Sequence, residues 1–228
     1  MMAAPARVAV YYAPRPDDAL FAAGATWLGR DPESDAPAPQ PDIADIAEVT
    51  AEPRQYGFHA TLKPPMRLAE GRQWFDVVLA ARALAARTAA FDLPHLSVHD
   101  VHGFLALRET GFCAPLQALA DACVEHLDPF RAPPSDAELA RRRRANLSAE
   151  QDAMLTRWGY PYVFATWFFH MTLTRRLTAG EKARFGPAAE AYFARAISVP
   201  RRVTDICLFT QAAPDAAFVI AERLPLRG

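Results

Sequence analysis

The chain has 228 residues, of which 51% are hydrophobic and 22% charged, with a formal net charge of −1. This composition is typical of a globular protein and excludes a wholly disordered chain. Because there is no basic excess, the sequence argues against a protein that grips a long nucleic-acid duplex by its phosphates. A small anionic substrate needs only a few local cations, so such a substrate stays compatible with the overall charge.

Targeting and redox signals in the sequence are sparse. The three cysteines, Cys113, Cys123 and Cys207, show no paired metal-ligand spacing and are interpreted as core or incidental thiols. The first residues lack the uninterrupted apolar core of a signal peptide, and no run of about 18 apolar residues occurs. We therefore expect a cytoplasmic monomer with no membrane partner and no cofactor.

In the first half of the chain, the apolar pattern predicts helices and strands that alternate. We expect a strand over 7–12, a helix over 17–28, a proline-rich loop over 31–41, a strand over 58–63 that Pro64 and Pro65 stop, and a helix over 74–85. A hairpin of two strands, over 93–98 and 104–108, and a helix over 115–127 follow.

The second half begins with a polar helical insert at about 131–160. Capping-box patterns at Ser135 and Ser148 indicate two short helices within it, and a third pattern at Thr178 indicates a later helix. Strands are expected over 164–174, 203–210 and 217–223. Interleaved elements with frequent hairpins indicate an α+β fold with largely antiparallel sheets. We expect a single domain over 1–228 with two lobes, each with one histidine strand, the helix after it and the following hairpin.

Two copies of the pattern His-x-Thr-Leu, at 59–62 and 170–173, are separated by about half the chain. Because side chains alternate faces along a strand, His59 lies beside Thr61 on one face, and His170 lies beside Thr172 on its own strand. The intervening residues are apolar. A single such motif is usually structural, but two copies with matching flanks favour a polar catalytic cleft.

The residue types suit phosphodiester chemistry. Cleaving or opening a phosphodiester requires that the attacking oxygen lose a proton and that the leaving oxygen gain one. Imidazole, with an unperturbed pKa near 6.5, can act as base or acid, so His59 and His170 can share the work without a metal. Thr61 and Thr172 can donate hydrogen bonds to the non-bridging phosphate oxygens. The residues leave open which histidine is the acid.

At these motifs the sequence resembles the 2H phosphoesterase superfamily, which includes RNA 2′,3′-cyclic phosphodiesterases and the so-called 2′-5′ RNA ligases. Ala60 is a weaker hydrophobe than the superfamily pattern prefers. The longer strings 54–65 and 169–174 are similar to the DUF1045 branch, whose members are often encoded beside carbon–phosphorus lyase genes for phosphonate breakdown. The resemblance implies a bilobal fold with a pseudo-twofold axis and two histidine strands that face each other across a groove.

Further residues are candidates for substrate binding. Lys63 is expected on the face of His59, and we favour it over Arg175 as the holder of a second phosphate or remote anion. Thr174 continues the face of Thr172, and Tyr56 either stacks on a base or sugar or simply packs. The run 141–144 is interpreted as a solvated helix, with the alternative that one of its arginines meets an anionic substrate.

The preferred substrate is a small cyclic phosphodiester. Given the resemblance to the phosphonate-associated branch, the first choice is a ribose cyclic phosphate such as 5-phosphoribosyl 1,2-cyclic phosphate. An RNA end or a nucleoside 2′,3′-cyclic phosphate is the second choice. Two other readings stay open: a binding protein for a phosphorylated ligand that it does not turn over, and a metal-dependent hydrolase built on His95, His99 and His102.

Overall fold

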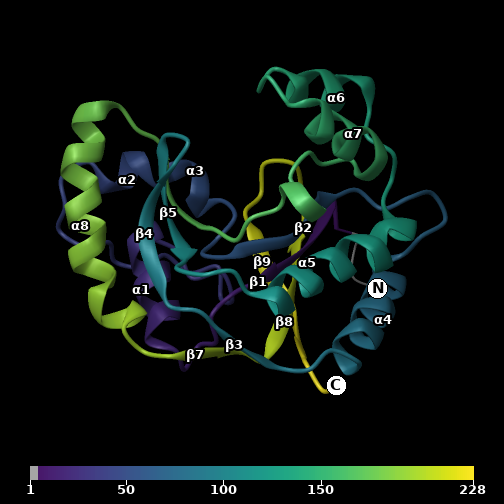
Figure 1. Ribbon diagram of the computed structural model, residues 1–228, viewed down its shortest axis with the longest axis horizontal. Coiled ribbons are helices and arrows are strands. Elements are labelled where there is room, and N and C mark those ends of the chain that lie inside the picture. The colour runs from purple at the N-terminus through teal and green to yellow at the C-terminus, as the bar shows by residue number, and fades with distance from the viewer. Residues whose placement is uncertain (1–4) are drawn as a thin grey trace.

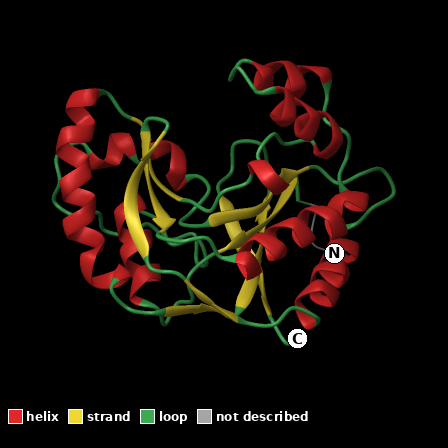
Figure 2. Cartoon of the chain, in the orientation of Figure 1, coloured by secondary structure: helices red, strands yellow, loops and turns green. Residues whose placement is uncertain are grey.

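The computed structural model describes residues 5–228 and shows helices packed around one strongly twisted antiparallel sheet (Figures 1 and 2). Residues 1–4, the start of the segment that bears on the signal-peptide prediction, lie outside the described residues. No helix within 5–228 combines the length and the apolar character that crossing a membrane requires.

The elements, in chain order, have the following bounds. The strands are β1 (Arg7–Tyr12), β2 (Ala60–Met66), β3 (Phe91–Leu93), β4 (Leu96–Val101), β5 (Phe104–Glu109), β6 (Met171–Arg176), β7 (Arg201–Val203), β8 (Asp205–Gln211) and β9 (Phe218–Pro225). The helices are α1 (Ala19–Leu28), α2 (Ile46–Val49), α3 (Ala51–Arg54), α4 (Trp74–Ala86), α5 (Ala114–Leu127), α6 (Asp136–Arg143), α7 (Ala149–Trp158) and α8 (Ala179–Ile197).

The seven-stranded sheet has the order β4-β5-β6-β2-β1-β8-β9, and all of its pairs are antiparallel. This confirms the α+β fold with largely antiparallel pairing. The sheet narrows in its middle, because β2 and β6 share the single residue pair Ala60–Met171. It therefore has two halves that meet at the two histidine motifs.

The order of helices and strands along the chain repeats once. The series β1, α1, α2–α3, β2, α4, β3, β4 is followed by β5, α5, α6–α7, β6, α8, β7, β8, and β9 comes last. The equivalent strands β2 and β6 pair with each other, as do β3 and β7 in a separate ribbon. The segment that the sequence suggested as an insert thus occupies, in the second series, the place that α2 and α3 occupy in the first.

One expectation about the two halves is wrong. Helix α4, which follows β2, does pack against its own half of the sheet, and α8 packs against the half that holds β6. The hairpins, however, are exchanged: β4 and β5 extend β6, whereas β8 and β9 extend β1. After α4 the chain runs through β3, and after α8 it runs through β7. These two strands pair with each other and carry the chain from one half of the large sheet to the other.

Two predicted strand limits are also wrong. Strand β2 does not stop at Pro64, because its register with β1 shifts between the pairs Val10–Lys63 and Val8–Met66. The prolines lie in this irregularity, where a missing backbone N–H costs no regular ladder bond. Residues 164–170 are not a strand, because the hydroxyl of Thr166 donates to the carbonyls of Pro161 and Val163 and stabilises a short 3₁₀ turn.

Capping residues explain the helix starts that the sequence did predict. Asp18 accepts a hydrogen bond from the backbone N–H of Leu20 at the start of α1. Ser135, Ser148 and Thr178 form the predicted capping boxes at α6, α7 and α8. Helices α2 and α3 were not predicted, since four residues each are too few to show a helical period.

A close contact between α1 and the first motif leads to a testable expectation. A Cβ on Gly24 would lie 2.0 Å from the ring of Phe58, which is buried directly before His59. We expect Gly24→Ala to lower the free energy of unfolding by about 1–3 kcal/mol, because the ring has to move. Urea denaturation measures this. Gly186→Ala is the matched control, because a Cβ at that helical glycine meets nothing within 4 Å. Equal stability of the two variants would contradict the expectation.

Candidate functional site

The two histidine motifs meet where the halves of the sheet join. Ala60 pairs with Met171, and the antiparallel register therefore sets His59 opposite Thr172 and His170 opposite Thr61. Ala60 and Met171 are fully buried in the core. The histidines and threonines lie on the other face, as the alternation along each strand predicted.

Two tryptophans hold the strands open beyond this pair. The indole N–H of Trp167 donates to the carbonyl of Thr61 at 2.9 Å, and that of Trp27 donates to the carbonyl of Leu173 at 3.0 Å. Both carbonyls belong to motif residues beyond the one β2–β6 pair. The indole N–H groups thus satisfy these two carbonyls, which within residues 5–228 have no partner across the split in the sheet.

Both imidazoles are oriented in the same way. Nδ1 of His59 lies 2.9 Å from the carbonyl oxygen of Gly57, and Nδ1 of His170 lies 3.1 Å from that of Phe168. A carbonyl can only accept, so Nδ1 carries the hydrogen and, in the neutral ring, Nε2 carries the lone pair. In each motif Nε2 is therefore the ring nitrogen that can take up a proton. Gly57 has a φ of 76°, which glycine adopts without strain.

His59 lies in an aromatic setting that disfavours its charged form. Its ring stacks on that of Tyr11, with 3.7 Å between the centroids, and its Nε2 lies 3.3 Å from Oγ1 of Thr61. Burial lowers the pKa of His59 to about 4, the hydrogen bond to Gly57 opposes this shift, and the charge of His170 adds to it. At neutral pH, His59 is therefore an uncharged base.

His170 has an arginine neighbour that the sequence analysis missed. Ala106 of β5 pairs with Thr172, so the register sets Arg108 opposite His170. Burial and, in smaller part, the charge of Arg108 lower the pKa of His170. The Arg108 guanidinium lies over the ring of Phe168 at 5.2 Å, and its buried Nε has no hydrogen-bond partner among the described residues. Only the pairing of β5 with β6 could have identified it.

A pocket of about 590 Å³ opens at the motifs. Five of the sequence-predicted site residues line it: Tyr56, His59, Thr172, Thr174 and Arg175. Thr61 and His170 do not line it. The His170 ring lies 5.9 Å, centroid to centroid, from that of Phe104, which does line the pocket. The other walls are Glu52, Pro53, Gly57, Phe104, Tyr160 and Arg176. No local pattern in the sequence singled out Glu52, Pro53 or Phe104.

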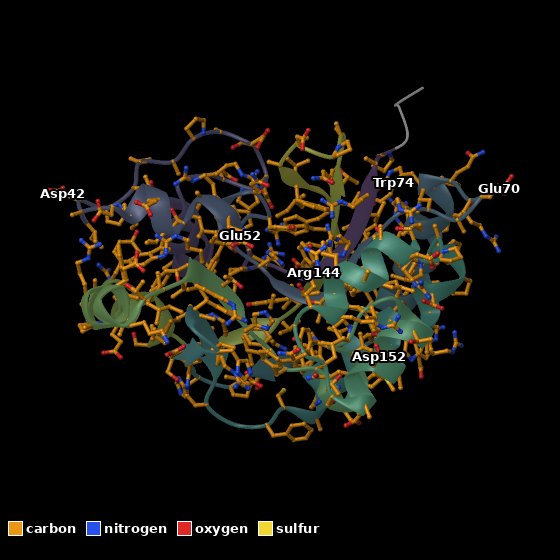
Figure 3. The ribbon with its side chains drawn as sticks, turned by 90° about the horizontal axis from the view of Figure 1, so that it is seen from above. Asp42, Glu52, Glu70, Trp74, Arg144 and Asp152 are labelled. Atoms are coloured by element: carbon orange, nitrogen blue, oxygen red, sulfur yellow. The ribbon has the colours of Figure 1, made fainter. Side chains whose placement is uncertain are left out.

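The pocket lies between α3 and the segment 131–160. Glu52 and Pro53 of α3 form one wall, and Tyr160, which follows α7, forms another. Figure 3, seen from above, places Glu52 and Arg144 near the middle of the molecule, while Asp42 and Glu70 lie toward its opposite ends. The two equivalent helical segments of the repeat thus flank the same opening.

Thr174 and Arg175, two of the predicted binding residues, already have protein partners for their polar side-chain atoms. The hydroxyl of Thr174 accepts a hydrogen bond from the backbone N–H of Leu105 at 3.0 Å. The Arg175 guanidinium donates to Glu48 at 2.6 Å and to Glu181 at 3.0 Å. Arg175 can bind a substrate anion only if it gives up one of these carboxylates. The Thr172 side chain makes no hydrogen bond within the described part of the chain, so its hydroxyl is available to a ligand.

The expectation that Lys63 shares the face of His59 is wrong. The register shift in β2 turns this residue to the helical side, where its Nζ donates to the carbonyl of Val124 at 3.1 Å and lies 3.7 Å from Asp128. Its side chain is 2% exposed and lines no part of the pocket. Burial lowers the pKa of Lys63 to about 8, and Asp128 partly opposes the shift.

We expect Lys63→Met to leave ligand binding unchanged and, at pH 7, to keep or raise the free energy of unfolding by about 1 kcal/mol. Below pH 8 Lys63 is charged in both the folded and the unfolded state, and burial of that charge destabilises the folded state. Between pH 8 and 10.5, the usual pKa of lysine, the folded state loses the proton first, so this destabilisation becomes smaller. Asp128 keeps Arg131 and Arg157 as partners. Urea denaturation and calorimetric titration check both parts. A stable variant that no longer binds ligand would restore the role that the sequence suggested.

The histidines proposed for a metal-dependent hydrolase do not converge. His99 Nε2 lies 2.8 Å from the hydroxyl of Ser97, and His102 lies in the turn after β4. Among residues 5–228, no group of three or more histidine, cysteine, aspartate or glutamate side chains is arranged to hold a metal ion. The structure therefore gives this alternative no site.

Comparison with known proteins identifies relatives. Residues 61–219 match the model of a family described as a protein of unknown function, DUF1045. Two curated relatives are named ribose 1,5-bisphosphate phosphokinase PhnN. The one from Janthinobacterium sp. (strain Marseille) is 40% identical over 97% of this chain and 51% of its own length. The one from Laribacter hongkongensis (strain HLHK9) is 38% identical over 93% and 50%. The chain thus spans about half the length of these relatives.

Solved structures also resemble the chain, at low sequence identity. A crystal structure of a phosphoesterase is 14% identical, with a TM-score of 0.46, over 98% of this chain and 100% of that one. The structure of E. coli LigT complexed with NADP+ is 12% identical, with a TM-score of 0.46, over 99% and 100%.

Proposed function

The chain belongs to the DUF1045 family, and we propose that it is a phosphoesterase that hydrolyses a small cyclic phosphodiester with His59 and His170 as its acid–base pair. The observation that carries this proposal is the shared orientation of the two imidazoles. Each is held through Nδ1 by a carbonyl two residues earlier, and each lies opposite the threonine of the other motif.

In the proposed reaction, His59 is the general base, because its depressed pKa keeps Nε2 free of a proton. Nε2 takes a proton from water, the water oxygen attacks phosphorus, and one ring P–O bond breaks. His170, in its protonated form, donates its Nε2 proton to the leaving oxygen. Thr172, on the wall of the pocket, donates to a non-bridging oxygen as negative charge builds up there.

We place the substrate among the ribose phosphates. The relatives that match this chain over about half their length are named for a kinase of ribose 1,5-bisphosphate. We infer that the kinase for which these relatives are named occupies the half that this chain does not match, and that the matched half acts on a related sugar phosphate. The pocket of about 590 Å³ has room for a sugar phosphate, and it carries Tyr56 and Tyr160 for packing against the ring.

Turnover of a panel of cyclic phosphates, followed by ³¹P NMR in excess chelator, tests the proposal. The panel contains 5-phosphoribosyl 1,2-cyclic phosphate, ribose 1,2-cyclic phosphate and nucleoside 2′,3′-cyclic phosphates. We expect conversion of a ribose cyclic phosphate to an acyclic monoester. If only the nucleoside compounds react, the substrate class is wrong and the mechanism stands. If a ligand binds tightly and no product forms over hours, the protein is a binding protein and the enzyme proposal is wrong.

A further inference from the structure

A second, smaller hollow lies where the segment 131–160 meets β1 and β2. Its volume is about 50 Å³, against about 590 Å³ for the main pocket. A water molecule occupies about 30 Å³ in the liquid, so the hollow has room for one small chemical group rather than a whole ligand. In Figure 1, α6 and α7 stand above this part of the molecule.

The hollow is lined by an unusual concentration of positive charge. Its walls include five arginines and one carboxylate, namely Arg7, Arg67, Arg131, Arg141, Arg142 and Glu138. Arg67 bonds to Glu138 at 3.0 Å, and Arg131 bonds to Asp128 at 2.7 Å. The other three arginines have no carboxylate partner within residues 5–228. Because the whole chain carries a net charge of only −1, this excess is local and not a general property of the surface.

Arg142 differs from the other members of its run. Arg141, Arg143 and Arg144 are exposed, whereas Arg142 is half-buried and its guanidinium lies 4.7 Å from the centre of the Tyr160 ring. Its side chain makes no hydrogen bond or ion pair with the described residues. Burial lowers the pKa of Arg142. A partly desolvated guanidinium without a counter-ion is costly, and a bound anion would remove that cost.

The hollow also adjoins the proposed reaction centre. Tyr160, beneath Arg142, lines the main pocket, and Gly159 beside it lines the hollow. Tyr11 stacks on His59, and the charge of Arg7 opposes the rise that burial causes in the Tyr11 pKa. Tyr160 therefore connects the two sites: it lines the pocket that His59 lines, and its ring lies under the Arg142 guanidinium.

We propose that this hollow is a subsite for a second anionic group of the substrate, a phosphomonoester, and that Arg142 is its main ligand. The planar guanidinium suits two-point binding of a phosphate, with Arg7 and Arg141 adding charge. The assignment of that group to the substrate rests on the proposed function. It specifies the substrate class further, as a cyclic phosphodiester that also bears a phosphate monoester.

Paired substrates and paired variants test the subsite. We expect Arg142→Gln to raise KM for 5-phosphoribosyl 1,2-cyclic phosphate by about 10-fold or more, the range of hydrogen bonds to charged groups, with kcat little changed. For ribose 1,2-cyclic phosphate, which lacks the monoester, KM should not change. Arg144→Gln removes an exposed arginine of the same run and should leave both substrates unaffected. Equal effects of Arg142→Gln on the two substrates, or no effect, would overturn the proposal.

A binding measurement keeps this test separate from catalysis. Calorimetric titration with ribose 5-phosphate should show binding to the wild type, to Arg144→Gln and to His59→Ala, and much weaker binding to Arg142→Gln. If these binding results are obtained and no substrate is converted, the subsite proposal holds and the enzyme proposal is wrong. Binding that is indifferent to Arg142 would overturn the subsite. Inorganic phosphate that binds as tightly as ribose 5-phosphate would overturn its assignment to a sugar phosphate.

Discussion

His59→Ala and His170→Ala are each expected to lower kcat by 10²-fold or more on the cyclic phosphate that the wild type turns over. Each imidazole transfers one proton in the proposed transition state, and a positioned general acid or base contributes about 10²- to 10⁴-fold. Because the two act in one step, the double variant should lose little more than the worse single variant. Steady-state kinetics with matched circular dichroism spectra measure these effects.

His126→Ala is the matched control for both variants. His126 is an exposed histidine of α5 whose Nδ1 also bonds to a backbone carbonyl, that of Ala122, at 2.8 Å, but it does not line the pocket. Its replacement should leave kcat unchanged. A fully active, folded His170→Ala variant would contradict the paired mechanism. In that case His170, which packs near Phe104, would be a structural residue only.

The largest expected effect on stability comes from the pKa of His59. The folded state holds this group at a pKa of about 4, whereas the unfolded chain has the usual 6.5. Above pH 6.5 both states are neutral and there is no effect. As the pH falls from 6.5 toward 4, the unfolded state binds a proton that the folded state refuses. Stability is therefore lost in this window, by up to about 3 kcal/mol.

Urea denaturation at a series of pH values from 8 to 4 measures this loss. His59→Gln removes the titrating group, so its free energy of unfolding should fall less steeply between pH 6.5 and 4 than that of the wild type. His126→Gln should follow the wild type. Parallel curves for the wild type and His59→Gln would mean that the His59 pKa is close to normal in the folded state, and hence that the imidazole is well hydrated.

The sequence predicted the centre of the candidate site because that information is local. The face shared by His59 and Thr61 follows from strand alternation across three residues, and the same holds for the second motif. The prediction for Lys63 was wrong because a register shift in β2 lies between this residue and Thr61. A residue pattern does not show where such a bulge occurs. Alternation predicts side-chain direction only while the pairing stays regular.

The rest of the site depends on contacts between distant segments. Arg108 lies beside His170 only because β5 pairs with β6, and nothing near Arg108 in the sequence signals this. The exchange of hairpins between the halves is likewise set by the β3–β7 ribbon, whose strands have three residues each. Arg142 is the one arginine of the run 141–144 that is partly buried, because its guanidinium lies over the Tyr160 ring. The position of Arg142 in the helical pattern does not show this contact.

The pH dependence of kcat/KM on the preferred cyclic phosphate tests whether His59 and His170 act together as base and acid. Both histidine pKa values are lowered in the free protein, that of His59 to about 4, so the base and the acid are in their working forms together only on the acid side of neutrality. We expect a bell-shaped profile with its maximum between pH 4 and 6.5, and loss of one limb in each single-histidine variant. A flat profile from pH 5 to 9, or a maximum above pH 7, would contradict catalysis by these two histidines.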